Sequence, residues 1–290
     1  MASAPPTDAV GFIEHQRYHK VRNPVEVVLK LTPIVLSNKL SSFPLSDQLQ
    51  MLESFSISSM DVGEHGAAKR AVEILEGIMR SGAGGVKAPE ESSRARRLRG
   101  LLAESAKDFS TASAIYTELL EQNPANYFCY KRRYAIQKAQ KKYPQAIKAM
   151  NEYLTLQPAD SSAWQELGQL YFDLGDYKSA AFAFEEVVLH HPLDALCHSQ
   201  LGDAYFCSAG GNKAGELGKG KNILELLKLA RNHYAKSCEL EGKRTNVGGR
   251  EGLVKASEAC VAWYDKNDEE GESADDRDLA LALALFGKEQ

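Results

Sequence analysis

The chain has few of the residues and motifs that carry chemistry. Its 290 residues include five cysteines, an odd number with no Cys-x-x-Cys pair, so we expect reduced, buried thiols and no disulfide framework. It has no glycine-rich phosphate loop ending in Lys-Ser/Thr, no His-Glu-x-x-His and no Gly-x-Ser-x-Gly. His190 and His191 would need further ligands to hold a metal, and none is apparent. We therefore expect no enzyme, no cofactor and no metal.

Long apolar runs are missing as well. The longest, from Leu279 to Phe286, has eight residues, whereas a membrane-spanning helix needs roughly 20. Residues 1–8 are small, polar and proline-rich, unlike the apolar stretch that opens a secretory signal. We expect a soluble, cytosolic protein that reaches any membrane only through partners.

A repeat with a period of 34 residues is the most informative feature that is present. Prolines followed by Asn or Asp recur at Pro124, Pro158 and Pro192. Three more columns keep the same spacing: aromatics at Phe109, Tyr143 and Tyr177; alanines at Ala112, Ala146 and Ala180; and bulky residues at Tyr116, Met150 and Phe184. This period is typical of stacked helix-turn-helix units, which usually bind other proteins.

One unit contains the complete tetratricopeptide pattern of Trp, Leu-Gly, Tyr, Ala, Phe and Pro. The residues are Trp164, Leu167, Gly168, Tyr171, Ala180, Phe184 and Pro192. Small Gly168 and Ala180 allow two helices to approach, and larger side chains fill the space around them. Asn126, Asp160 and Asp194 are spaced as N-caps of the next first helices, with Ser92 one period upstream. We predict an all-α tetratricopeptide-repeat superhelical solenoid.

The predicted organisation is a single solenoid over residues 11–264. Disordered residues 1–10 precede irregular helices at 11–60, where Pro24 and Pro33 each mark a helix start. The predicted repeats are 49–80, 93–126, 127–160, 161–194 and 195–242, with a closing helix at 246–264. Flexible loops are expected at 81–92 and at 208–221, the latter with five glycines and three lysines.

The C-terminal region separates charge from apolar residues. Residues 265–278 contain eight acids and two bases, a net charge of −6, whereas the whole chain carries −4. We interpret this segment as a flexible acidic linker leading to a short apolar helix at 279–290. That helix could dock either on the solenoid or on a partner.

A concave groove is the candidate partner-binding site. First helices of the early repeats are basic, from Arg94 to Lys142. From the known geometry of this fold, the groove positions are Arg94, Arg97, Lys131, Lys138, Gln165, Gln169, Phe172, Ser199, Asp203 and Phe206. A groove that is cationic at one end and aromatic-polar at the other suits a protein segment with acidic and apolar residues. Nucleic acid is a weaker alternative because the basic excess is modest.

Many tetratricopeptide adaptors clamp a C-terminal carboxylate with Lys, Asn and Arg side chains. The corresponding positions are Lys131, Ala135, Glu166, Leu196 and Gln200 in one register. In the other register they are Arg97, Leu101, Arg132, Ser162 and Glu166. Neither set forms the clamp, and Glu166 would repel a carboxylate. A free co-chaperone-like adaptor that binds acidic peptides remains the alternative function.

Several elements are more specific than the repeat columns. Lys131-Arg132-Arg133, Ala135-Ile136, Lys138-Ala139-Gln140 and Asn151-Glu152-Tyr153-Leu154 resemble subunit 2 of the endoplasmic-reticulum membrane protein complex. The likeness is strongest over about residues 118–207 and weaker over 55–264. The resemblance implies a non-catalytic scaffold on the cytosolic face of the endoplasmic reticulum. It further implies that the scaffold cradles cytosolic parts of membrane subunits 3, 4 and 5 and a soluble subunit, 8 or 9, in a complex that inserts membrane proteins.

Overall fold

The computed structural model describes residues 11–14, 23–37, 39–80, 89–211, 221–241, 247–267 and 273–289, which are helical and contain no strand. None of the described helices is long and apolar enough to cross a membrane. The chain divides into two compact units, Met1–Ala149 and Met150–Gln290. We predicted one continuous stack. A repeat stack can divide in this way because each repeat contacts only its neighbours.

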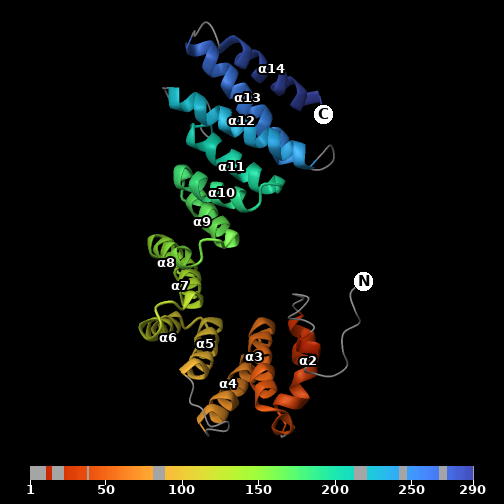
Figure 1. Ribbon diagram of the computed structural model, residues 1–290, viewed down its shortest axis with the longest axis vertical. Coiled ribbons are helices and arrows are strands. Elements are labelled where there is room, and N and C mark those ends of the chain that lie inside the picture. The colour runs from red at the N-terminus through yellow and green to blue at the C-terminus, as the bar shows by residue number, and fades with distance from the viewer. Residues whose placement is uncertain are drawn as a thin grey trace. The chain divides into compact units, whose positions relative to one another are not determined.

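The first unit begins with irregular helices and continues with repeat hairpins (Figure 1). After a helical turn at 11–14 come α2 (Pro24–Val35), a 3-10 turn (Leu40–Ser42), α3 (Leu45–Val62) and α4 (His65–Arg80). Next are α5 (Pro89–Ser105), α6 (Phe109–Gln122), α7 (Tyr127–Ala139) and α8 (Tyr143–Leu156), whose last turns belong to the second unit. A core that includes Phe12, Leu31, Phe55 and Leu75 holds the first of these helices together.

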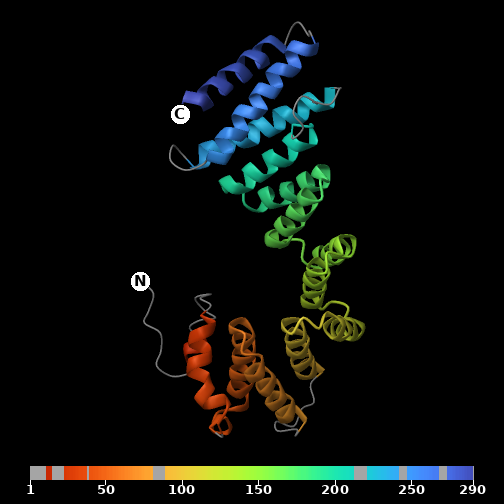
Figure 2. The same cartoon turned by 180° about the vertical axis from the view of Figure 1, so that it is seen from behind.

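The second unit is a regular stack, seen from two sides in Figures 1 and 2. It contains α9 (Ser161–Asp173), α10 (Tyr177–His190), α11 (Ala195–Ser208), α12 (Lys221–Glu241), α13 (Val247–Asn267) and α14 (Ser273–Glu289). Consecutive helices pack side by side from α9 to α14. Two apolar clusters fill the unit, one around Phe184 and Tyr234 and the other around Trp263 and Tyr264.

The repeat columns form the contacts between paired helices. Ala112, Ala146, Ala180 and Ala230 are fully buried, and so are the bulky residues Tyr116 and Met150. A Cβ built on Gly168 would lie 2.7 Å from Cε1 of Phe184, and one built on Gly100 would lie equally close to the Tyr116 ring. Glycine is therefore needed where each ring meets the facing backbone. Trp164 lies farther out, half-buried against Phe182.

Each repeat turn also repeats the same backbone geometry. Positive φ angles occur at Lys107 (62°), Lys141 (58°), Gly175 (78°) and Gly210 (88°), so the turn follows the period of the sequence. The amide of the next residue closes the helix end in each case, as when Asp176 N donates to Tyr171 O over 3.0 Å. Two of the four positions are lysines, which adopt this conformation at a cost that glycine does not have.

Several predicted boundaries need correction. Ser92 lies inside α5 and is no N-cap, and Pro33 lies inside α2, where it precedes the helix end by two residues. Asp160 and Asp194 do cap their helices, whereas Asn126 stands at the cap position without a side-chain hydrogen bond. Residues 1–10 of the predicted disordered tail, 81–88 of the predicted loop 81–92 and 212–220 of the predicted loop 208–221 lie outside the described residues, whereas 89–92 belong to α5.

The predicted acidic linker, 265–278, is largely helical. α13 extends to Asn267 and α14 begins at Ser273, six residues earlier than the predicted helix at 279–290; residues 268–272 lie outside the described part. Acidic side chains are favourable in the first turn of a helix because they face its unpaired amides. Arg277 of α14 also pairs with Asp265 of α13 over 2.6 Å. The terminal helix packs on α13, as in the first of the two docking alternatives.

Candidate partner-binding site

The cationic part of the predicted groove belongs to the first unit. Arg94 on α5 pairs with Glu53 on α3 over 3.3 Å, and the Arg97 guanidinium lies 5.5 Å from the centre of the Phe128 ring. Lys131 is half-buried on α7, whereas Lys138 is exposed, with its ammonium 5.5 Å from the centre of the Tyr134 ring. Lys138 is therefore the predicted cation that the fold leaves most accessible to a partner.

Two further arginines of the basic stretch hold helices together. Arg96 pairs with Glu118 on α6 over 3.2 Å, and Arg99 pairs with Glu76 on α4 over 2.8 Å. These bonds join α5 to the helices on either side of it in the sequence. Much of the positive charge in the early repeats is thus matched by carboxylates, which weakens the case for nucleic acid.

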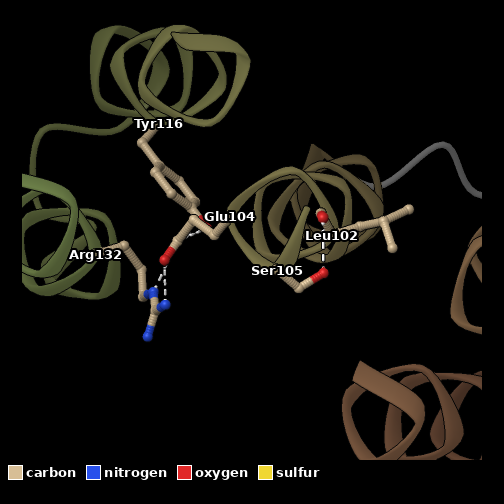
Figure 3. A network of polar contacts seen from close by, with 5 residues as sticks. All are labelled: Leu102, Glu104, Ser105, Tyr116 and Arg132. Atoms are coloured by element: carbon tan, nitrogen blue, oxygen red, sulfur yellow. Dashed lines mark hydrogen bonds and ion pairs between the residues drawn. The ribbon is translucent and has the colours of Figure 1, made fainter. Parts of the chain in front are cut away.

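Arg132 makes two hydrogen bonds to one carboxylate on a neighbouring helix (Figure 3). Its Nε donates to Oε1 of Glu104 over 2.9 Å, and Nη2 donates to the other carboxylate oxygen. The Tyr116 hydroxyl donates to the same Oε1 over 2.6 Å. The Glu104 side chain is only 10% exposed, so one carboxylate ties α5 to both α6 and α7. Our sequence reading placed Arg132 in a basic stretch and missed Glu104.

The electrostatics of this triad follow from burial. Burial raises the pKa of Tyr116, and the hydrogen bond to the Glu104 carboxylate raises it further. Burial alone would lower the pKa of Arg132, but Glu104 more than offsets it and the net shift is upward. The phenol and the guanidinium therefore keep their protons throughout the physiological range. The triad is a fixed structural connection among three helices.

The polar part of the predicted groove lies in the second unit. Gln165 on α9 donates to Gln200 on α11 over 3.3 Å, so these amides line adjacent first helices. Gln169 is exposed and donates to Asp173 on the same helix over 2.7 Å, and Ser199 is half-buried on α11. Amide and hydroxyl groups at this density can form hydrogen bonds to a bound peptide backbone.

The remaining predicted groove residues in the second unit also pack against the fold. Phe172 meets Tyr177 edge-on at 5.2 Å between ring centres, and half-buried Phe206 contacts both apolar clusters. Asp203 accepts a hydrogen bond from the Tyr234 hydroxyl over 2.6 Å, and burial of its carboxyl raises its pKa. The two phenylalanines therefore form the apolar wall of this surface and are not free anchors.

A histidine pair on α11 and α12 was not foreseen. Nδ1 of His198 lies 3.0 Å from Nδ1 of His233, and Nε2 of His198 lies 3.1 Å from the Pro192 carbonyl. Their rings stack, and His233 also stacks on Tyr205. Burial and the neighbouring His198 lower the pKa of His233 to about 4. The two residues are 35 apart and lie on the two helices of one repeat, so the repeat period gave no signal that links them.

Four of the cysteines have unreactive thiols. Burial raises the pKa of Cys129, Cys197, Cys207 and Cys260 to about 11. Three of them are less than 5% exposed. Since the thiolate is the reactive form, these residues act as small apolar side chains, as predicted.

Two surface hollows lie away from the predicted groove residues. One, of about 600 Å³, is lined by Phe109, Ser110, Ser113, Ala114, Thr117, Glu118, Glu121, Ile136, Gln137, Gln140 and Lys142 of the first unit. The other, of about 620 Å³, is lined by residues 190–195 and Leu240. Leu193 in its lining is 78% exposed, and Leu189, next to the lining in the sequence, is 73% exposed. None of the ten predicted groove residues lines either hollow.

Comparisons with known proteins agree with this picture. Residues 89–209 match the model of the EMC2 TPR-like repeat domain. ER membrane protein complex subunit 2 of Xenopus tropicalis is 41% identical over 86 residues, 30% of this chain and 29% of that protein. The subunit of the same name from Dictyostelium discoideum is 27% identical over 128 residues, 44% of this chain and 37% of its own. The alignments thus span less than half the length of these relatives.

Two further similarities concern repeats in general. A co-chaperone, sgt12 of Aspergillus fumigatus, is 32% identical over 91 residues, 31% of this chain and 27% of that protein. The crystal structure of the C-terminal part of a TPR repeat-containing protein from Cytophaga hutchinsonii has a TM-score of 0.55. It is 17% identical and covers 96% of this chain and 93% of its own. The all-α tetratricopeptide class is therefore confirmed.

The matching proteins are repeat proteins and complex subunits, in agreement with the expectation that the chain is not an enzyme. The family model covers α5 to α11, the helices that carry the 34-residue columns and all ten predicted groove residues. The predicted resemblance is confirmed over residues 89–209, which match the EMC2 TPR-like repeat domain.

Proposed function

We propose that this chain is a non-catalytic scaffold subunit of the endoplasmic-reticulum membrane protein complex. It sits on the cytosolic side of the membrane and is held there by its partners. Those partners are cytosolic segments of membrane subunits 3, 4 and 5 and the soluble subunit 8 or 9. The complex inserts transmembrane proteins, and this subunit supports insertion by holding the other subunits in place.

The match of residues 89–209 to the EMC2 repeat domain is the observation that carries this proposal. The geometry of the described residues supports it in two ways. Polar side chains line adjacent first helices, as where Gln165 meets Gln200, and such groups suit a bound segment in extended or helical form. The early arginines are used to brace α5, which is expected of a rigid support and not of a catalytic cleft.

Affinity purification of the full-length chain from detergent-solubilised endoplasmic-reticulum membranes tests the proposal. We expect subunits of the complex to co-purify with it in near-equal amounts. Lys138→Glu reverses an accessible charge within the predicted groove and should lower their recovery severalfold. Lys178→Glu makes the same change at an exposed position on α10, outside the predicted set, and should leave recovery unchanged. A wild-type chain that purifies alone would contradict the proposal.

A free adaptor that binds acidic peptides is the second candidate, because of the similarity to a co-chaperone. The described positions do not favour it. Arg132, one of the potential clamp residues, is bonded to Glu104, and Leu196, at another, is an exposed apolar residue. This function predicts that the isolated chain binds acidic C-terminal peptides and loses them on Lys131→Ala. Binding that is unaffected by that change would exclude the clamp.

A further inference from the structure

The last helix covers a surface with a distinctive chemistry. We call this surface the terminal face: Leu227, Lys228 and Arg231 of α12 with Cys260, Trp263 and Tyr264 of α13. Its apolar members form one buried cluster together with Ala280 of α14. Figures 1 and 2 show α12, α13 and α14 side by side at the end of the second unit. The terminal face therefore combines aromatic and apolar area with two cations.

Arg231 has hydrogen-bonding capacity that α14 does not satisfy. The residue is 4% exposed, and within the described part of the chain neither its Nε nor its Nη1 has a hydrogen-bond partner. A buried cation left in this state is costly, since burial removes water without replacing its hydrogen bonds. Such a group indicates that the terminal face is built to bind more negative charge than it holds.

Asp276 of α14 supplies only part of that charge. Its carboxylate is hydrogen-bonded to Lys228 and lies 3.5 Å from the Tyr264 hydroxyl. Arg231 interacts with it through charge, without a hydrogen bond among the described atoms. The hydrogen bond from Lys228 lowers the pKa of Asp276, so the carboxylate stays ionised in this contact. Two donors, Lys228 and Tyr264, thus share this carboxylate, and Arg231 is left without a hydrogen bond to it.

The apolar part of the contact is also weak. α14 buries Ala280 and Ala284, whereas Leu279 is 49% exposed and Leu281 is 45% exposed. Each buried methyl contributes only about 0.8 kcal/mol. The interior repeats, in contrast to α14, bury large side chains such as Phe184 and Leu201. Among the other described apolar side chains of α14, Leu283 is half-buried and Ala282 is exposed.

We propose that the terminal face is a binding site for an acidic amphipathic helix of a partner protein, and that α14 occupies it as an intramolecular substitute. The partner helix carries at least two carboxylates near its start, one for Lys228 and one for Arg231, followed by an apolar side. α14 has the same order of acidic and apolar residues but satisfies the site incompletely. A basic helix is excluded as occupant by the two cations. The inference goes beyond the proposed function and holds under either candidate function.

A labelled peptide with the sequence of residues 273–289 is the probe, and fluorescence anisotropy measures its binding to the full-length chain. The tether keeps α14 at an effective concentration in the millimolar range, so the wild-type chain should bind the free peptide weakly. Asp276→Lys with Ala284→Glu in the full chain releases α14 and should raise peptide affinity at least tenfold. Adding Arg231→Met to that variant should lower affinity again at least tenfold.

Two neighbouring acids provide the matched control. Asp276 pairs with Lys228, whereas Asp275 is exposed on the same turn. A peptide with D276N should bind the released chain about tenfold more weakly, and a peptide with D275N should bind as the original does. Equal binding of the two altered peptides would overturn the proposal. So would release of α14, seen as lost hydrogen-exchange protection, without any gain in peptide binding.

A measurement on the wild-type chain covers the case in which the released variant does not fold. The amides of α14 should exchange at least tenfold faster than those of α13, because the substitute helix opens without unfolding the unit. Equal protection of the two helices would show that α14 is a permanent part of the core. Binding of the released chain to phosphatidylserine vesicles, with no competition from the peptide, would identify a lipid headgroup as the anion and also overturn the proposal.

Discussion

The hairpin of α5 and α6 and the hairpin of α11 and α12 solve the same packing problem with different electrostatics. In each, a tyrosine ring meets a glycine of the facing helix: Tyr116 against Gly100, and Tyr234 against Gly202. Each hydroxyl donates to a carboxylate of that helix, Glu104 or Asp203, over 2.6 Å. In the first hairpin Arg132 neutralises the carboxylate through two bonds. In the second, Lys255 interacts with Asp203 only through charge.

This difference distinguishes the contacts that the repeat specifies from the contacts that depend on individual neighbouring side chains. The α9–α10 hairpin has Phe184 at the same place, without a hydroxyl and with the same close approach to Gly168. These three hairpins therefore share the ring and the glycine, whereas the α7–α8 hairpin has Met150 and Tyr134 at the corresponding positions. A tyrosine occupies the ring position where a carboxylate lies close enough to accept a hydrogen bond from its hydroxyl. A cation on a third helix, such as Arg132 on α7, makes that carboxylate part of a larger network.

The largest expected effect would come from breaking the network in the first hairpin. Glu104→Ala should destabilise the chain by about 2–4 kcal/mol, less than for a fully buried pair because Arg132 keeps some exposure to water. It leaves the Arg132 guanidinium and the Tyr116 hydroxyl without their acceptor. Urea unfolding followed by circular dichroism measures the loss. Asp203→Asn is the comparison in the second hairpin and should cost about 1 kcal/mol, since an amide oxygen still accepts from Tyr234. Equal losses of stability in the two variants would show that the two hairpins do not differ in this way.

Glycine substitutions test the part that the hairpins share. Gly168→Ala places a Cβ 2.7 Å from Phe184 and should destabilise by about 1–3 kcal/mol through overpacking. Gly77→Ala in α4 meets nothing within 4 Å and should stabilise by about 0.5–1 kcal/mol through helix propensity. Thermal unfolding of both variants measures the contrast. A Gly168→Ala chain that melts as the wild type does would show that the ring and the backbone are not in contact.

Acid should affect the second unit through His233, whose folded pKa is about 4, below the ordinary value of 6.5. The unfolded chain binds this proton first, so the stabilising contribution is complete above about pH 6.5 and is lost as pH falls toward 4. We expect a loss of about 1–2 kcal/mol over that range, reduced by the partial exposure of the ring. Unfolding at pH 7 and pH 5 measures it. His233→Phe keeps the stacking on Tyr205 and should flatten the dependence of stability on pH. An unchanged pH dependence in this variant would show that other groups cause it.

The smallest effect concerns the turns of the two early repeats. Lys107 and Lys141 have positive φ, which glycine adopts without strain. Lys107→Gly and Lys141→Gly should each stabilise by about 0.5–1 kcal/mol after the added flexibility of the unfolded chain is subtracted. Lys142→Gly, at the neighbouring position without positive φ, should be destabilising. Differential scanning calorimetry can resolve these shifts, and a loss on Lys141→Gly would mean that its side chain has a binding role in the turn.

The sequence predicted the repeat architecture well because its columns report local packing. Gly168, Ala180 and Phe184 meet within one hairpin, and the N-caps at Asp160 and Asp194 are separated from their helices by a few residues only. Contacts of this kind leave a regular trace in the chain. The resemblance of the central repeats rests on the same segment, which is why it covers residues 89–209 and not the ends.

The features that the sequence did not reveal depend on contacts that repeat spacing does not encode. Arg132 looked like one cation among many because Glu104 lies 28 residues away, a separation unrelated to the period. The acidic segment looked like a linker because its charge was counted without Lys228, the partner that holds Asp276. The predicted groove residues remain proposals, and several of them are shared with the packing of the fold.

The turn after α11 has a practical consequence for labelling. Gly210 and the hydrogen bond from Gly211 N to Phe206 O complete the end of α11, and the described part of α12 begins at Lys221. The groups that end α11 therefore all lie at or before Gly211. A fluorophore or an epitope introduced between these points would report on the protein in its complexes without disturbing the repeat on either side.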